Sequence, residues 1–131
     1  MNDCIFCKII KNELPSKTIY EDDLIKVIMN INPTTNGHLL VLPKKHYVNI
    51  FDIDEKIISH SFKIIRDKLY PLLKEKLGCE GLTISENNLL GQEIPHFHIH
   101  VTPRYKDDLV DYLYNKDMLE DIETVYSKLL S

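Results

Sequence analysis

The stretch His96-Phe97-His98-Ile99-His100-Val101-Thr102 is the most informative part of this 131-residue chain. Side chains alternate between the two faces of a β-strand, so in a strand the three histidines share one face. Phe97, Ile99 and Val101 then point to the opposite face, toward a core. Two residues of strand rise separate neighbouring imidazoles by ~7 Å, so two of them can engage one small anion or one metal ion. The stretch therefore predicts a buried strand with a functional histidine face.

Two other interpretations of the histidine face stay open. The imidazoles could be amphipathic strand residues that alternate without a function. The His-x-His spacing could instead supply ligands to a catalytic zinc ion that keeps one coordination position for water. A zinc hydrolase of this kind would lose its catalysis when the metal is removed.

The regions around this stretch predict a single α+β domain over residues 1–131. In chain order we expect a helix over 4–11 capped by Asp3, strands over 18–21, 24–29 and 38–42, a helix over 54–77, strands over 82–85 and 96–102, and a final helix. The long helix has apolar residues at helical spacing, which should cover the sheet: Ile58, Phe62, Ile65, Leu69 and Leu72. Pro71 predicts a kink or break in it, and His60 lies off its apolar face as a solvated residue. The final helix presents Leu119, Ile122, Tyr126 and Leu129 on one face.

Composition excludes several classes of function. The formal net charge of −4 argues against a broadly basic nucleic-acid-binding surface. No apolar run exceeds four residues, so neither a membrane span nor a secretory signal is expected, and we expect a cytoplasmic protein. Three cysteines in a reducing compartment make a disulfide framework improbable, so the pair Cys4-x-x-Cys7 needs another explanation.

Four motifs, which agree in order and spacing with those of the histidine-triad (HIT) family, together resemble this family and in particular its Hint-like branch. They are the segments Cys4–Ile10, Gly37–His46, Gly91–Ile94 and His96–Thr102. They place the motif-bearing part of the domain at residues 3–105 and leave a divergent segment at 106–131. The resemblance implies a HIT-like fold, an antiparallel sheet of about five strands with a long helix packed on it. It also implies a homodimer that forms through the sheets.

The resemblance assigns chemistry to three histidines. Members of this family transfer or hydrolyse nucleotidyl groups through a covalent nucleotidyl-histidine intermediate, and His98 matches the nucleophile. An imidazole that donates from one nitrogen to a carbonyl presents the lone pair of the other to phosphorus. His100 would contact phosphate and protonate the leaving group, and His38 would orient that group. Backbone amides of Gly91, Gln92 and Glu93 would approach the α-phosphate.

The same resemblance suggests a metal site. Relatives with this N-terminal motif use two cysteines and two histidines that match Cys4, Cys7, His46 and His96. Such a set satisfies the ligand types and number that zinc prefers and leaves no open position, so the zinc would be structural. The alternative is a reduced thiol pair without metal.

The nucleoside site is also carried over from the family. Positions that sandwich the base match Ile5, Phe6, Ile9, Ile28 and Ile31, each of which could equally be a core residue. Two positions depart from the family pattern. Asn30 stands where relatives usually carry a ribose-binding aspartate, and Ser85 stands where many carry a phosphate-contacting asparagine.

The resemblance therefore implies a hydrolase or nucleotidyl transferase of the phosphoramidase type. Its expected substrates are nucleoside 5′-monophosphate derivatives with a purine base, such as AMP or GMP derivatives. Hydrolysis of dinucleoside polyphosphates is one alternative. A nucleotide-binding regulatory protein with incidental catalysis is another.

Overall fold

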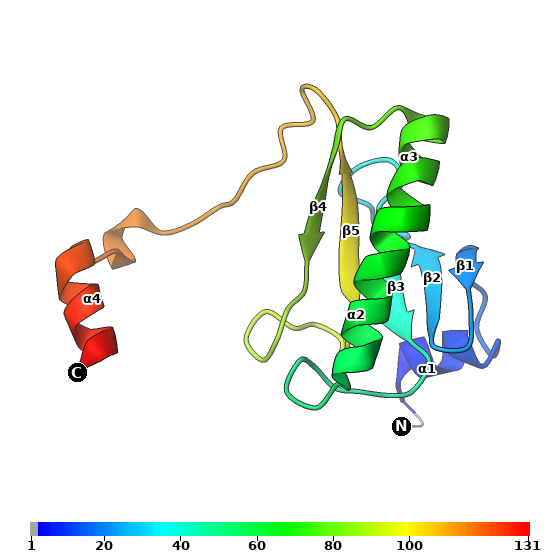
Figure 1. The fold of residues 1–131 in the computed structure, drawn as a ribbon, viewed down its shortest axis with the longest axis horizontal. Helices are drawn as coiled ribbons and strands as arrows, with labels where there is room; N and C mark the ends of the chain where they lie inside the picture. The colour runs from blue at the N-terminus through cyan, green and yellow to red at the C-terminus, as the bar shows by residue number, and fades with distance from the viewer. Residues whose placement is uncertain (1–2) are drawn as a thin grey trace.

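A five-stranded antiparallel sheet forms the centre of the computed structural model, which describes residues 3–131 (Figure 1). The strands are β1 (Thr18–Glu21), β2 (Ile25–Met29), β3 (Leu39–Pro43), β4 (Gly81–Ser85) and β5 (Ile99–Arg104), in the spatial order β1-β2-β3-β5-β4. The predicted α+β class and the strand count are confirmed. The histidine-bearing strand β5 lies inside the sheet, between β3 and β4.

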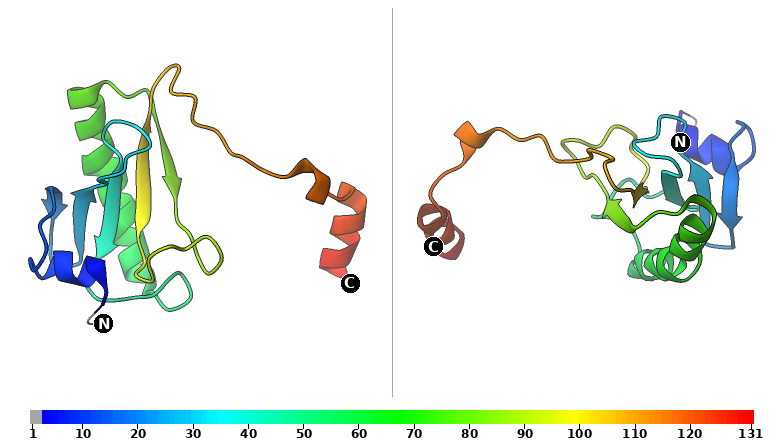
Figure 2. Two further views of the ribbon diagram at one scale, coloured as in Figure 1. Left: turned by 180° about the vertical axis from the view of Figure 1, so that it is seen from behind. Right: turned by 90° about the horizontal axis from the view of Figure 1, so that it is seen from above.

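Helices lie on both faces of this sheet. The long helical segment, α2 (Glu55–Ile64) and α3 (Tyr70–Leu77) joined by a π-helical turn (Ile65–Leu69), covers one face, and the short helix α1 (Ile5–Ile10) lies on the other (Figure 2). Alternate strand residues therefore enter different cores. Val27, Val41 and Ile99 pack beneath the long segment. Ile28 and Leu40 pack beneath α1.

The long helical segment differs from the prediction in its buried face. Its buried residues are Ile57, Ser61, Ile64, Ile65, Leu69 and Leu73, whereas Phe62 is 46% exposed and Leu72 is 37% exposed. The spacing of apolar residues does not predict that Ser61 is buried, because serine is polar. Its hydroxyl can be buried because it donates a hydrogen bond to the Ile57 carbonyl. The break expected at Pro71 takes the form of the π-helical turn just before it, where the wider turn accommodates the missing amide donor.

The histidine stretch is only partly strand. β5 begins at Ile99, so His96 and His98 precede it, although the alternation of faces holds throughout. The reason lies in the backbone partners. The amide of Phe97 donates to the Tyr47 carbonyl, and the carbonyl of His96 accepts from the His98 ring rather than from a neighbouring strand.

The final helix, α4 (Ile122–Leu130), has no buried residue and stands away from the body of the molecule (Figure 1). It starts after the predicted Leu119, and its apolar residues are exposed, with Leu129 at 78%. The predicted final helix is therefore present, but it begins three residues after Leu119 and its apolar face is not covered by the described part of the chain.

Candidate active site and metal cluster

Helix α1 supplies residues to two clusters at once. It is capped by Cys4 rather than by Asp3, because the Cys4 sulfur accepts a hydrogen bond from the Cys7 amide at 3.3 Å. This turn places both thiols at the N-terminal end of the helix. Phe6 and Ile9 point down onto the sheet and are buried there.

The other end of α1 is held by a residue that sequence reasoning missed. Lys26 on β2 is 1% exposed, and its ammonium donates to the Ile9 carbonyl at 3.1 Å and to Asn12 Oδ1 at 3.2 Å. A cation at the C-terminal end of a helix stabilises the carbonyls left unpaired there. The only sequence signal was a lysine within an otherwise apolar strand.

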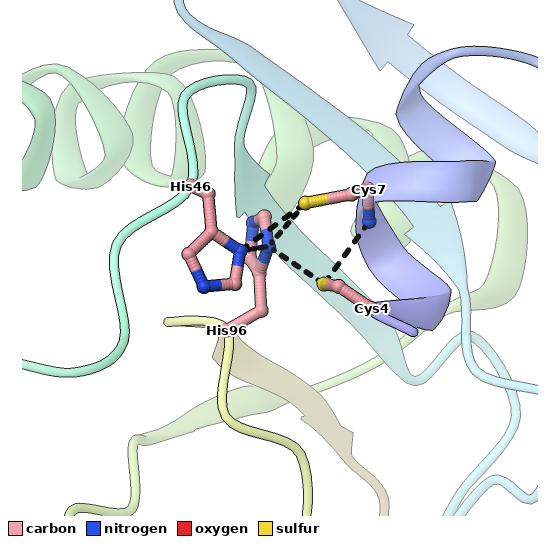
Figure 3. Close-up of side chains that lie close together, drawn as sticks. All are labelled: Cys4, Cys7, His46 and His96. Carbon is pink, nitrogen blue, oxygen red and sulfur yellow. Dashed lines mark hydrogen bonds between the residues drawn. The ribbon is translucent and has the colours of Figure 1, made fainter. Parts of the chain in front are cut away.

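Cys4, Cys7, His46 and His96 converge into one cluster (Figure 3). Their ligand atoms all lie within 4.8 Å of one another. His96 Nδ1 is 3.3 Å from the Cys4 sulfur and 3.5 Å from the Cys7 sulfur, and His46 Nδ1 is 3.1 Å from both the Cys7 sulfur and His96 Nδ1. A tetrahedral zinc ion separates sulfur and nitrogen ligands by about 3.3 to 3.8 Å, so the four residues fit such an ion.

The His96 ring is set up as a ligand by its other nitrogen. Its Nε2 donates to the Pro43 carbonyl at 3.0 Å, which leaves the Nδ1 lone pair facing the thiols. Burial lowers the pKa of His96 to about 4, so the ring is neutral at pH 7. Burial, followed by the interaction with Cys4, raises the pKa of the Cys7 thiol to about 11, so without a cation this sulfur stays protonated.

His98 is buried like His96 but has different neighbours. Its Nδ1 donates to the His96 carbonyl at 2.8 Å, which fixes the tautomer and leaves Nε2 with a free lone pair. The ring lies edge to face against Phe6, with 5.1 Å between centroids. The structure therefore holds His98 in the tautomer that a nitrogen nucleophile needs.

His38 and His100 form a hydrogen-bonded pair beside His98. The Thr34 amide donates to His38 Nδ1 at 3.0 Å, so His38 carries its proton on Nε2 and donates it to His100 Nδ1 at 2.9 Å. His100 Nε2 is then the protonated nitrogen. Burial lowers the pKa of His38, and burial together with the neighbouring His98 and His38 lowers the pKa of His100 to about 4. Both rings are neutral at pH 7.

A cavity of about 680 Å³ opens onto this group of histidines. Its lining contains His98, His100 and most of the residues expected to bind the nucleotide: Ile5, Phe6, Ile9, Ile28, Asn30, Ile31, Gly91 and Glu93. His38 does not line it and reaches it only through His100. One wall is apolar and the histidine end is polar, which suits a group with a flat ring at one end and a phosphate at the other.

Three expected binding residues have other contacts. The Gln92 amide donates to the Val48 and Ile94 carbonyls, so its side chain braces the loop and does not line the cavity. Ser85 lines a second, smaller cavity. Asn30 accepts from the Asn32 amide through Oδ1 at 2.9 Å, so its Nδ2 is the group nearest to His38.

His60 is also placed differently from the expectation. It is half-buried rather than solvated, and its Nε2 lies 2.6 Å from Asp22 Oδ2 in the β1–β2 turn. Hydrogen bonds from His60, Tyr20 and two backbone amides lower the pKa of Asp22 despite its partial burial. This contact links the β1–β2 turn to α2. It could not be predicted from the sequence, in which Asp22 and His60 are far apart.

Comparison with known proteins agrees with this arrangement. Residues 11–107 match the HIT domain family. The chain belongs to the HIT family. A HIT-like protein of Methanocaldococcus jannaschii is 43% identical over 107 residues, which cover 80% of this chain and 81% of that protein. Adenosine 5′-monophosphoramidase HNT1 of Saccharomyces cerevisiae is 32% identical over 103 residues, 77% of this chain and 62% of that one.

Solved HIT structures share the fold. A HIT family protein from Bacillus anthracis superposes with a TM-score of 0.81 at 31% identity, covering 98% of this chain and 94% of that one. A zinc-bound histidine triad protein from Mycobacterium smegmatis superposes with a TM-score of 0.79 at 30% identity, covering 88% and 85%. The HIT fold implied by the four sequence motifs is thereby confirmed.

None of the helices in the described residues 3–131 has the length and apolar character needed to cross a membrane.

Proposed function

We propose that this HIT protein is a nucleoside phosphoramidase that cleaves the phosphorus–nitrogen bond of purine nucleoside 5′-monophosphate derivatives. One observation carries the proposal. The free Nε2 of His98 and the protonated Nε2 of His100 belong to rings that line the same cavity. A similarity to a protein named as an adenosine 5′-monophosphoramidase supports the same reaction class.

In the proposed reaction His98 Nε2 attacks phosphorus. The P–N bond breaks, its electron pair stays on nitrogen, and a proton from His100 completes the leaving amine. His100 is neutral in the free protein, with its proton on Nε2. When the anionic phosphate binds beside it and raises its pKa, the added proton goes to Nδ1, and this nitrogen then no longer accepts from His38. In the second step water attacks phosphorus, His100 accepts the water proton, and the bond to His98 breaks to release the nucleoside monophosphate.

The remaining groups position the substrate. In the free protein, His38 holds the His100 ring in position through the 2.9 Å hydrogen bond. Gly91, with a φ of 95°, adopts a backbone conformation that L-residues rarely reach, and amides of this loop can approach the phosphate. Phe6 and the isoleucines of the apolar wall would hold the base.

We also propose that the cysteine–histidine cluster holds a structural zinc ion. Cys4, Cys7, His46 and His96 fill all four tetrahedral positions, so the ion would stabilise the fold and leave no position for substrate. It would tie α1, and with it the apolar wall of the cavity, to the loop between β3 and α2 and to the segment before β5. The zinc-bound relative supports this assignment.

We further propose that two copies of the chain pair along β4. This strand is at the edge of the sheet, and a hollow of about 670 Å³ beside it is lined by Phe62, Ile65, Tyr70, Leu82 and Ile84. The C-terminal segment exposes further apolar side chains, including Leu113 and Ile122. Light scattering should give the mass of two chains of 15.3 kDa, and the mass of one chain would contradict the pairing.

The proposed function is tested by a panel of substrates with the wild-type protein and with His98→Ala. AMP and GMP phosphoramidates and diadenosine polyphosphates would be compared at equal concentration. We expect turnover of the phosphoramidates and a covalent nucleotidyl adduct on His98, detected by mass spectrometry. Turnover by the His98→Ala protein at the wild-type rate would refute the mechanism.

A further inference from the structure

Lys26 is a cation on the strand floor beneath α1, where its neighbours are apolar. It pairs with Leu42 on β3 and shares its face of β2 with Ile28, and both of these residues belong to the buried cluster under the helix. The lysine is only 1% exposed, and no carboxylate of the described residues forms an ion pair with it. Burial of a charge is unfavourable unless hydrogen bonds compensate for it. The contacts that Lys26 makes with α1 therefore compensate for its burial.

These contacts involve the end of α1 and the turn that follows it. The Ile9 carbonyl accepts from the Lys26 ammonium at 3.1 Å and from the Asn12 amide at 3.0 Å. Asn12 Oδ1 accepts from the same ammonium at 3.2 Å. Asn12 has a φ of 62°, a left-handed conformation that ends a helix and that asparagine adopts more readily than most residues. One buried ammonium thus holds the last turn of α1 and the residue that redirects the chain.

Residues 9–16 depend on these contacts for their position. Helix α1 has six residues, which is too few for a helix that is stable without tertiary contacts. Among the described residues, the only hydrogen bonds that join residues 9–16 to the sheet are the two donated by Lys26. Packing of Ile9 on the sheet adds stability, but the hydrophobic effect has no preferred direction. The orientation of this segment is therefore set by Lys26.

The same segment forms one side of the nucleotide cavity. Ile9 and residues 14–16 line its apolar side. Its histidine end is lined by His98 and His100, which belong to β5 and the segment before it. Lys26 itself does not line the cavity. The two ends of the cavity are thus held by different parts of the chain, and Lys26 acts on the apolar side.

We infer that Lys26 is a positioning residue for the base of the nucleotide. It does not touch the substrate, and it acts by holding Ile9 and Asn12 so that the apolar side of the cavity can pack on the base. The inference rests on the proposed function, which places the base at the apolar side and the phosphate at the histidine end. Loss of the Lys26 ammonium should therefore weaken binding of the base and leave binding of the phosphate unchanged.

The test compares AMP with ribose 5-phosphate, which has the same ribose and phosphate but no base. Lys26→Met removes the ammonium and keeps an unbranched side chain that can be buried among apolar residues. It should raise the Kd for AMP by about fivefold to tenfold, the effect of about one lost hydrogen bond, and leave the Kd for ribose 5-phosphate within about twofold of wild type. NMR titration measures both constants. An equal rise for both ligands, or no rise for AMP, would overturn the inference.

Three further variants serve as matched controls. Asn12→Gly keeps the left-handed backbone but removes the Oδ1 acceptor, so it should show the same selectivity as Lys26→Met with a smaller amplitude. Asn12→Asp retains an acceptor for the ammonium and should bind AMP like the wild-type protein. Lys74→Met removes an exposed lysine of α3 and should change neither constant. An equal loss of AMP affinity in Asn12→Asp and Asn12→Gly would contradict the inference.

Amide hydrogen exchange distinguishes failure of this inference from failure of the proposed function, because it needs no nucleotide. In Lys26→Met, the amides of Asn12 and Glu13, which donate to carbonyls of α1, should exchange at least about threefold faster, while those of β2 and β3 keep their wild-type rates. If the wild-type protein binds neither ligand but the faster exchange is confined to these two amides, the proposed function fails and the anchoring role of Lys26 stands. Unchanged exchange there, or faster exchange throughout the sheet, would refute that role.

Discussion

His96 and His98 are two residues apart, lie on the same face, and are 0% and 7% exposed, yet the structure sets them up for opposite roles. His96 donates through Nε2 to Pro43 and directs Nδ1 at two thiols. His98 donates through Nδ1 to the backbone and leaves Nε2 free on the cavity side. The nitrogen that each ring uses for a structural hydrogen bond decides whether it can serve as a ligand or as a nucleophile.

This difference has an energetic consequence. Groups around His96 connect segments that are remote in sequence, so loss of this cluster should be seen mainly in folding. The His98 ring lines the cavity, so replacing it should mainly lower the rate of the reaction. The following experiments test this separation, from the largest expected effect to the smallest.

His98→Ala should lower kcat by at least about three orders of magnitude, because it removes the atom that forms the covalent intermediate. Nucleotide affinity should remain within a few-fold of wild type, since the apolar wall of the cavity is intact. Stopped assays and calorimetric titration with AMP measure the two quantities. A comparable loss of affinity and turnover would show that His98 acts in binding, which would erase the proposed contrast with His96.

Cys7→Ser or His46→Ala should abolish binding of one zinc per chain and lower the free energy of unfolding by several kcal/mol, roughly 3 or more, because metal binding is coupled to folding. Turnover per folded molecule should fall much less. Elemental analysis, thermal melts and active-site titration measure these effects together. Wild-type protein that is free of metal and equally stable would rule out the site.

Acidification should destabilise the wild-type protein through His100. The pKa of His100 is about 4 in the folded protein and about 6.5 in the unfolded chain, so the unfolded state binds the extra proton between these values. Stability from this residue is complete above pH 6.5 and is lost as the pH falls toward 4, by up to about 2 kcal/mol after allowance for its partial exposure.

His100→Gln should remove this part of the pH dependence, because glutamine does not titrate. Urea unfolding at pH 7, 5.5 and 4.5 measures it as the difference between the two proteins. Parallel pH profiles for wild type and the variant would show that His100 is not buried as a neutral ring.

Asn30→Asp should have the smallest effect. A carboxylate there can accept from both ribose hydroxyls, and bonds to an ionised acceptor are about twice as strong as neutral ones. Ribonucleoside monophosphates should therefore bind more tightly by on the order of 1 kcal/mol, with part of the gain offset by repulsion from the phosphate. 2′,3′-dideoxy analogues should gain little, and an equal change for both ligands would mean that residue 30 does not contact the ribose.

The amino-acid sequence by itself determined the class of fold and the composition of the histidine face. Alternation at His96, His98 and His100, helical spacing over residues 54–77, and the breakers Pro71 and Gly78 are local properties, and all predicted the observed elements to within a few residues. The order of the motifs also predicted the HIT family. These features depend on neighbours in the chain, so they can be read without knowing the three-dimensional arrangement.

Only the tertiary structure decided the roles of individual side chains. The tautomers of His96 and His100 depend on partners more than fifty residues away, Pro43 for His96 and His38 for His100. Which face of the long helical segment is buried depends on the π-helical turn and on the burial of Ser61. The spacing of apolar residues predicts neither of these features. From the sequence alone, Lys26 would be predicted to lie on the surface; it is buried because α1 packs over it. Hydrogen-bond partners and burial are set by contacts between remote segments, and these contacts exist only once the chain has folded.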